Sequence, residues 1–213
     1  MKRYLYGKNK YLSGVVGDEG IIRFSDIIHY GRNPNEQMRD NEILKHFILD
    51  KSSYRFLYNG ADLESNSMSS NPMISAFTPR AFCLCLTKKK DDPELYARFE
   101  ADICIEIDVE KYFDKLSKDF EAWSGAEVFA GDINYYPQIM TSGKPDLLRL
   151  LFQKPDRFYI ESEYRIAIRI PPDHNFEMSN GEITRVYSDV ESEGQYLFLK
   201  NSLLGCLGDV YYR

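Results

Sequence analysis

The sequence lacks several features that identify the common protein classes. Its 213 residues include only 4 cysteines, 3 histidines and 1 tryptophan. No two cysteines have the CxxC spacing of a structural zinc site, and the few histidines leave a metal without its usual ligands. The N-terminal segment has no apolar run long enough for a signal peptide, and nowhere do about 18 apolar residues form a transmembrane stretch. We therefore expect a cytoplasmic protein with no metal and no membrane contact.

The cysteines fit the same compartment. Cys83, Cys85, Cys104 and Cys206 all stand within apolar stretches, as buried reduced thiols do. Cys83 and Cys85 would point to one face of a strand, and neighbouring positions on one strand make poor disulfide partners. We therefore expect four free thiols with a packing role.

The signatures of the common catalytic classes are also missing. The chain has no GxxxxGK[ST] phosphate loop, no GxGxxG turn, no HExxH helix and no GxSxG elbow. A net charge of −6 argues against general affinity for nucleic acid or anionic membranes. The chain does contain 16 tyrosines and 13 phenylalanines, which exclude a disordered protein because they suffice to build a core.

Short strand-like and helix-like segments alternate without the regular βαβ repeat of a parallel α/β fold. The expected strands are 3–7, 54–60, 82–87, 102–109, 131–137 and 157–170, and 82–87 has the fully apolar character of a central strand. The expected helices are part of 33–50, 92–101, 110–123 and 146–153. We therefore predict one α+β domain over residues 1–213, with a mixed or largely antiparallel sheet and short helices.

Two segments carry stronger local signals. In 92–101, Asp92 is a natural N-cap, Pro93 fits the first helical position, and Glu94 suits the positive end of the helix dipole. Residues 59–75 combine Gly, Pro, Ser and Asn with few large apolar side chains. That composition predicts a long polar loop, of the kind that forms functional lids or mobile excursions.

The segment 157–170 contains the most distinctive charges. If it forms one strand, alternation places Glu161, Glu163 and Arg165 on the same face, with the two carboxylates about 7 Å apart. Such a pair can hold a ribose hydroxyl and stabilise positive charge developing on a sugar carbon. The alternative is a solvated strand face whose charges pair with each other.

The order of motifs resembles a loosely defined group of bacterial and phage proteins. The shared segments read GIIRFSDIIHYGRNPNEQMRDNE early in the chain and FQKPDRFYIESEYR late in it. More remotely, the chain is similar to the ADP-ribosyltransferase fold, which carries an Arg or His on its first strand, a central Ser-Thr-Ser or Tyr element and a late Glu-x-Glu. The resemblance implies an NAD-consuming transferase or glycohydrolase that acts in conflict between bacteria and phages.

The resemblance also implies roles for individual residues. Glu163 would be the catalytic carboxylate, Glu161 would position an acceptor, and Arg3 would orient the NAD pyrophosphate. The nearest central hydroxyl element is Ser75-Ala76-Phe77-Thr78, which departs from Ser-Thr-Ser. The residues implied in binding NAD, the co-substrate, are Arg3, Tyr4, Tyr30, Ser75 and Thr78.

Two other functions stay open. The tyrosine-rich, acidic composition also fits a non-catalytic interaction protein, such as a phage-encoded inhibitor or a defence-system accessory. A metal-dependent nuclease would use Asp132, Glu161 and Glu163, but Arg165 stands where such sites usually carry Lys. The expected partner is accordingly a small nucleotide ligand or a protein target.

Overall fold

The computed structural model describes residues 1–17, 20–177, 180–187, 195–200 and 202–213. The helices are α1 (Asn9–Val16), α2 (Pro93–Arg98), α3 (Val109–Glu121) and the 3-10 helices η1 (Ile27–Arg32), η2 (Ser65–Ser67), η3 (Leu150–Phe152) and η4 (Asp156–Glu161). The strands are β1 (Lys2–Gly7), β2 (Ile22–Asp26), β3 (Leu44–Leu49), β4 (Phe56–Tyr58), β5 (Ala61–Leu63), β6 (Met73–Phe77), β7 (Phe82–Thr87), β8 (Ile103–Asp108), β9 (Glu127–Asp132), β10 (Asn134–Tyr136), β11 (Ile139–Met140), β12 (Gln153–Pro155), β13 (Glu163–Arg169), β14 (Asn175–Glu177), β15 (Ile183–Arg185), β16 (Tyr196–Leu199) and β17 (Leu207–Tyr212). Only two strand pairs, β10–β12 and β11–β3, are parallel among the described residues. The predicted single α+β domain with short helices and a largely antiparallel sheet is confirmed.

Strand β7 is the centre of the main sheet. It pairs antiparallel with β13 along one edge, and with β1 and β2 along the other. Strands β8 and β17 continue the sheet beyond β1, β16 lies beyond β2, and β9 lies beyond β13. Apolar residues on both faces of β7 let it bury nearly completely, which confirms the central strand that FCLCLT predicted.

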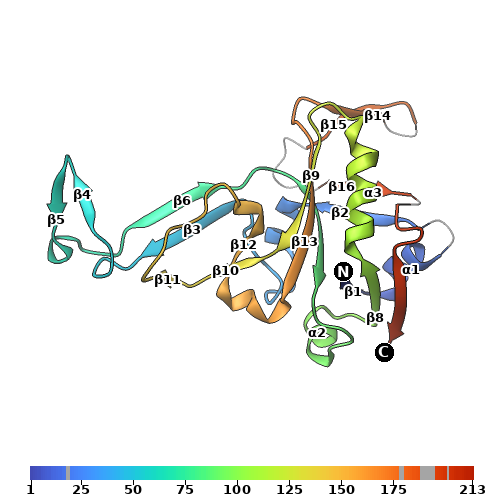
Figure 1. The fold of residues 1–213 in the computed structure, drawn as a ribbon, viewed down its shortest axis with the longest axis horizontal. Helices are drawn as coiled ribbons and strands as arrows, with labels where there is room; N and C mark the ends of the chain where they lie inside the picture. Colours follow the sequence, from blue (N-terminus) through green and yellow to red (C-terminus); the bar gives the residue numbers. More distant parts are fainter. Residues whose placement is uncertain (18–19, 178–179, 188–194, 201) are drawn as a thin grey trace.

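The two faces of the main sheet are covered differently. Helix α3 lies across one face (Figure 1), where Tyr112, Leu116 and Phe120 repeat every four residues and join the core with Ile166 of β13. The other face of β13 carries Ala167, which packs in a smaller apolar cluster with residues of β7 and η3. A strand in this position therefore alternates between two separate environments.

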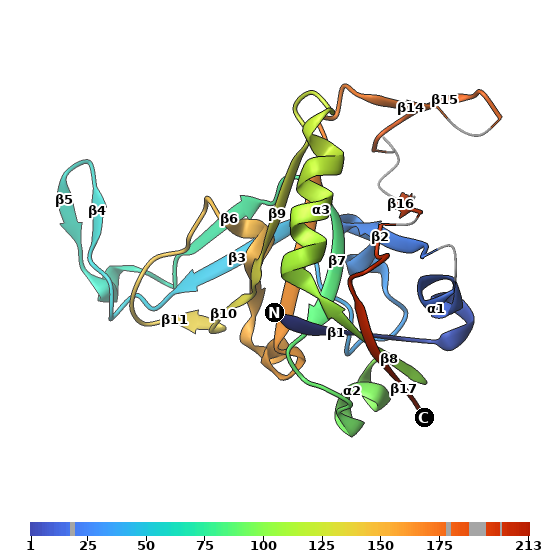
Figure 2. The ribbon, with the colours of Figure 1, turned by 45° about the vertical axis from the view of Figure 1, so that its right-hand side comes forward.

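A second sheet extends from the body as an arm, seen in both Figure 1 and Figure 2. Its central strand β3 pairs antiparallel with β6 and parallel with β11, and the β4–β5 hairpin stands at its far end. One face of the arm is packed by a small core that includes Phe47, Tyr136 and Met140. We call β3, β6, β11 and this hairpin the arm.

Several local predictions are confirmed. The Asp92 carboxylate accepts a hydrogen bond of 2.8 Å from the backbone N–H of Glu94, with Pro93 opening α2. The four cysteines are free thiols, and burial raises the pKa of the Cys83 thiol to about 12. Among the described residues, no helix is both long and apolar enough to cross a membrane.

The prediction of helix within 33–50 is wrong. Residues 44–49 form β3, with Lys45, Phe47 and Leu49 buried on one side and His46 exposed on the other. Pairing with β6 and β11 satisfies the β3 backbone on both edges, so this tertiary arrangement outweighs the near-helical spacing of the apolar residues.

The predicted polar loop at 59–75 is also wrong, because most of it is structured. Asn59 and Gly60, with φ of 50° and 83°, form the turn that joins β4 to β5, and an Asn-Gly pair is a favoured hairpin turn. Helix η2 and the start of β6 occupy much of the remainder. Polar composition here reflects the exposed hairpin of the arm.

The segment 157–170 is not one strand. Helix η4 runs to Glu161, Ser162 takes the left-handed conformation with φ 44° and ψ 46°, and β13 begins only at Glu163. Glu161 and Glu163 therefore lie on different elements, joined by a sharp turn. The helix predicted at 146–153 is likewise reduced to η3 and the short strand β12.

This turn can be tested by substitution. We expect Ser162→Val to lower the free energy of unfolding by about 1–2 kcal/mol, because a β-branched residue is strained at positive φ. Ser162→Gly should be neutral or slightly stabilising. Thr184→Val on β15, a strand position without positive φ, is the control and should change stability by less than about 0.5 kcal/mol in urea denaturation. Equal effects of the two valine variants would contradict the strain at Ser162.

Candidate functional site

A group of buried charged side chains lies on the face of β13 opposite α3. We call it the ionic cluster, and its members are Glu42, Lys45, Lys154, Glu161, Glu163 and Arg165. They come from the segment before β3, from β3 itself, from β12, from the end of η4 and from β13. None is more than 5% exposed. Burial of this kind is tolerated only where each charge meets an opposite charge or a hydrogen-bond partner.

Arg165 is the centre of this arrangement. Its guanidinium donates two hydrogen bonds to the Glu42 carboxylate, of 2.7 and 3.2 Å, and one of 2.8 Å to Glu163 Oε1. A fourth, of 2.7 Å, goes to the carbonyl oxygen of Leu151. The planar guanidinium suits this geometry because its donors point outward in a fixed fork.

Two lysines complete the neutralisation. Lys154 Nζ donates to Glu161 Oε2 at 2.9 Å and to Glu163 Oε2 at 3.0 Å. Lys45 Nζ donates to Glu42 Oε2 at 2.8 Å and to the carbonyl oxygen of Gln153 at 2.6 Å. Three cations thus face three carboxylates, so the cluster carries no net charge.

Electrostatics keep the central carboxylates ionised. Burial alone would raise the pKa of Glu163, but the charges of Arg165 and Lys154 outweigh it and hold this pKa well below the usual range. The same balance lowers the pKa of Glu42. Both groups are therefore anions at neutral pH, already engaged with cations.

Asp40 lies beside the cluster, but its carboxylate is not neutralised by a direct bond to one of the cluster's cations. The residue is 4% exposed, and its Oδ2 has no hydrogen-bond partner within the described parts of the chain. Burial, and then the nearby charge of Glu42, raise the pKa of Asp40 to about 6. Asp40 is thus the carboxylate of this region that changes charge near neutral pH.

The residues expected to bind NAD are not gathered around Glu163. Tyr4 pairs with Thr87 across the sheet, and Thr87 pairs with Glu163, so these three side chains share one face. Arg3 precedes Tyr4 and points to the opposite face, where its guanidinium lies 4.9 Å from the Tyr164 ring. The main sheet therefore separates Arg3 from Glu163.

The other expected residues are dispersed over the structure. Tyr4 is buried next to α2, and Tyr30 donates a 3.3 Å bond to the carbonyl oxygen of Cys83. Ser75 is on the arm, where its hydroxyl lies 3.0 Å from His46 Nδ1. Thr78 follows β6 and is buried. Tyr30 approaches the ionic cluster, with its ring 6.0 Å from the Arg165 guanidinium. The backbone N–H of Thr78 donates a 2.8 Å bond to the carbonyl oxygen of Ile43, the residue after Glu42.

The cluster also leaves little chemistry available to Glu161 and Glu163. Each oxygen of Glu163 already accepts a bond from a cation, and Glu161 accepts from Lys154 and, at 3.1 Å, from Arg98. Asp132 points away from Glu163, because it pairs directly with Tyr164 across the sheet. Within the described residues no set of three metal-ligating side chains gathers, so nothing places a nuclease metal there.

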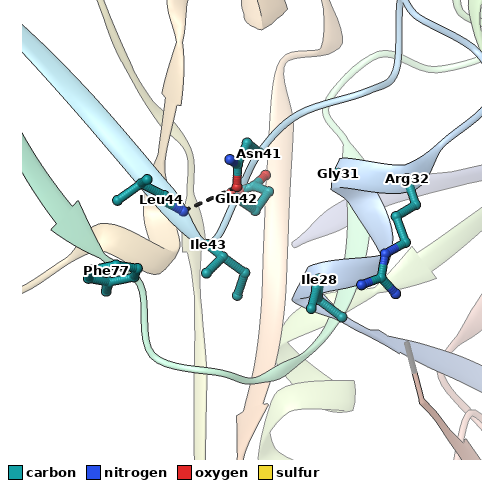
Figure 3. Close-up of a pocket in the computed structure, with 8 residues that line it drawn as sticks. All are labelled: Ile28, Gly31, Arg32, Asn41, Glu42, Ile43, Leu44 and Phe77. Carbon is teal, nitrogen blue, oxygen red and sulfur yellow. Dashed lines mark hydrogen bonds between the residues drawn. The ribbon is translucent and has the colours of Figure 1, made fainter. Parts of the chain in front are cut away.

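Neither of two cavities in the structure is lined by Glu161 or Glu163. The cavity in Figure 3, of about 360 Å³, lies at the root of the arm between η1, the segment before β3 and the end of β6. The other, of about 500 Å³, lies beside β9 and the residues 147–152. Sequence reasoning missed Lys154 as the partner of the acidic pair, and it missed the Glu42–Lys45 pair, because no helix or strand periodicity links these positions.

The exposed side of the arm is the other prominent feature. Five apolar residues form it, and we call them the apolar arm face: Leu44, Ile48, Met73, Phe77 and Ile139. They pair across neighbouring strands, Leu44 with Phe77 and Ile48 with both Met73 and Ile139. Phe77 is 74% exposed and Met73 56% exposed, so this face is open to solvent although it is apolar.

The energetic role of the cluster can be tested at Arg165. We expect Arg165→Met to lower the free energy of unfolding by about 3–5 kcal/mol, because Glu42 and Glu163 would keep buried charges without a partner. The matched control is Arg169→Met on the same strand, where the ion pair with Glu127 is partly exposed and worth less than about 1 kcal/mol. Urea denaturation measures both, and equal losses would contradict a special role for the buried network.

Asp40 predicts a pH dependence of stability. Its folded-state pKa is raised, so its contribution to stability is fully present below the ordinary Asp pKa near 4 and is lost as pH rises through about 6. Asp40→Asn lacks this titration, so its free energy of unfolding relative to the wild type should rise between pH 4 and pH 7, by at most about 3 kcal/mol. Denaturation midpoints across this range measure the gain. Glu36→Gln, at an exposed position, is the control, and an Asp40→Asn difference that does not change with pH would overturn the assignment.

Comparison with known proteins adds no assignment to this geometry. No family model, no curated protein and no solved structure matches the chain. The resemblance to the ADP-ribosyltransferase fold therefore stays a prediction, and function has to be argued from the arrangement of the residues themselves.

Proposed function

We propose that this protein is a non-catalytic interaction module that binds a protein partner through the apolar arm face. The observation that carries the proposal is the exposure of paired apolar side chains on one side of the arm, including Met73 and Phe77. Contiguous exposed apolar surface on a folded protein commonly marks a binding site.

The construction of the arm supports this reading. The opposite side of the same strands already has its own core, in which the rings of Phe47 and Tyr136 lie 4.6 Å apart between centroids. The apolar arm face is therefore not needed to fold the arm. Antiparallel sheets with one packed face usually place polar residues on the other, and this sheet departs from that pattern.

The chemistry of the face suits a protein more than a nucleotide. The polar pair between its apolar pairs, His46 and Ser75, is already joined by a hydrogen bond of 3.0 Å. The remaining side chains are apolar and provide no donors for phosphate oxygens. Burial of such groups against another protein is favourable at roughly 25 cal/mol per Å² before the costs of association.

The ionic cluster argues against the alternative function, NAD consumption at Glu163. An NAD-consuming reaction at Glu163 needs a carboxylate that can meet a ribose hydroxyl, yet both of its oxygens are held by Arg165 and Lys154. Freeing it would break two buried charge-assisted bonds. The cluster is better suited to fixing η4, β12 and β13 beneath the arm.

The arm face predicts where a partner is contacted. With a photo-crosslinking residue at position 73 or 77, in cells that make the protein, we expect one partner protein to be captured from both positions. A crosslinker at position 11, where Tyr11 is 72% exposed on α1, should not capture it. The partner is then purified, and Phe77→Ser should weaken its binding at least about tenfold while Tyr11→Ser does not.

Two outcomes would contradict the proposal. The first is capture that is equal from positions 11, 73 and 77, or absent from the arm. The second is release of nicotinamide from NAD by the wild type that is lost in Glu163→Gln but kept in Glu127→Gln, which would assign the protein to NAD consumption. Thermal unfolding of Phe77→Ser should match the wild type, since the side chain is exposed.

A further inference from the structure

Strand β6 is an open edge of the arm. The backbone groups of Pro72 and Thr78, which flank it, bond toward the β3 side at 2.9 and 2.8 Å. Because bonding directions alternate along an antiparallel strand, the backbone N–H and C=O groups of Met73, Ser75 and Phe77 point away from β3. No further strand pairs with β6 among the described residues, so these groups are available to another chain.

This edge lacks the features that usually prevent such pairing. Residues 73–77 read MISAF, with no charge and no proline, and their register with β3 is continuous. By contrast, the edge strand β17 carries Asp209 and an irregularity between Leu207 and Val210. Natural proteins normally protect edge strands with charges or bulges, so an unprotected one indicates use in binding.

The last residue of β6 lines a cavity that also contains a cation. Phe77 lines the 360 Å³ cavity at the root of the arm together with the apolar side chains of Ile28, Ile43 and Leu44 (Figure 3). Arg32 lines the same cavity, and within the described residues no carboxylate forms an ion pair with it. Asn41 and Glu42 also line this cavity, but the Glu42 carboxylate is already bonded to Arg165 and Lys45. A largely apolar cavity with a guanidinium that pairs with no described carboxylate is complementary to an apolar side chain beside a carboxylate.

We propose that an extended segment of the protein partner adds to β6 as a further strand, with an Asp or Glu side chain at its end next to Arg32. Its backbone bonds to Met73, Ser75 and Phe77, and its apolar side chains at alternate positions extend the apolar arm face. This is strand addition, in which the backbone supplies affinity and the side chains supply specificity. The inference rests on the proposed function, because it specifies what the arm binds.

A second copy of this chain is a weaker occupant. If two β6 strands paired antiparallel about Ser75, Met73 would face Phe77 of the other copy. The residues that follow toward Arg32 would then be Asn71 and Pro72, which carry no charge. A copy would leave the guanidinium without a counter-charge, whereas an acidic segment supplies one.

The inference is tested with a phage-displayed library of random peptides selected on the full-length protein. We expect enriched sequences to alternate apolar residues and to end in Asp or Glu at one fixed position. A synthetic peptide of the enriched sequence should bind the wild type in fluorescence anisotropy and lose about tenfold affinity on Arg32→Gln. Arg39→Gln changes an exposed arginine whose guanidinium donates to the carbonyl oxygens of Asn33 and Pro34, and it should change affinity by less than about twofold.

The strand geometry gives a second readout. N-methylation of the peptide should abolish binding at the alternate positions whose N–H faces β6 and should be tolerated at the intervening ones. The inference is overturned by no enrichment, by no preference for an acid, by equal sensitivity at every N-methyl position, or by a dimer in light scattering that Ser75→Lys dissociates. If the library fails while crosslinking at 73 and 77 still captures a partner, strand addition is wrong and the proposed function stands. If both fail, the proposed function is wrong as well.

Discussion

A fully buried guanidinium constrains the centre of this molecule. Arg165 stands on a strand whose other face builds the main core, so its charge cannot reach water without removing Ile166 and its neighbours from under α3. The chain has to supply anions in place, and it does so from Glu42 and Glu163. Removing one partner of such a network destabilises a protein far more than the intact network stabilises it. The network therefore acts mainly to fix one arrangement of the elements that carry its charges.

This constraint connects the body to the arm. Glu42 and Lys45 belong to the segment that enters and begins β3, and they bind Arg165, Lys154 and the Gln153 backbone within the body. The root of the arm is therefore held by charge-assisted hydrogen bonds, while its outer part depends on the small core around Phe47. A rigid root holds the exposed face and the edge of β6 in a fixed orientation, and such preorganisation lowers the entropy cost of the strand addition that we propose.

The same constraint gives the acidic pair, Glu161 and Glu163, a structural surrounding that differs from that of a catalytic pair. Two carboxylates near one another are a common catalytic arrangement when they face a cleft and differ in pKa. Here Glu161 and Glu163 face lysine and arginine, and the neighbouring acid whose pKa is raised is Asp40. The buried charges of the ionic cluster are thus engaged with one another, and the surface that we propose for recognition is apolar.

Local sequence determined the elements whose signals lie within a few neighbouring residues. The apolar run of β7, the Asp92 cap of α2 and the four-residue spacing of α3 each needed only neighbours in the chain, so they could be predicted. Alternation also placed Glu163 and Arg165 on one face of β13. Tertiary structure alone decided that β3 is a strand, that Glu161 leaves the strand, and that the acidic pair is neutralised. The reason is physical: Glu42 and Arg165 are 123 residues apart in sequence, and only the folded sheet brings their charges within 2.7 Å.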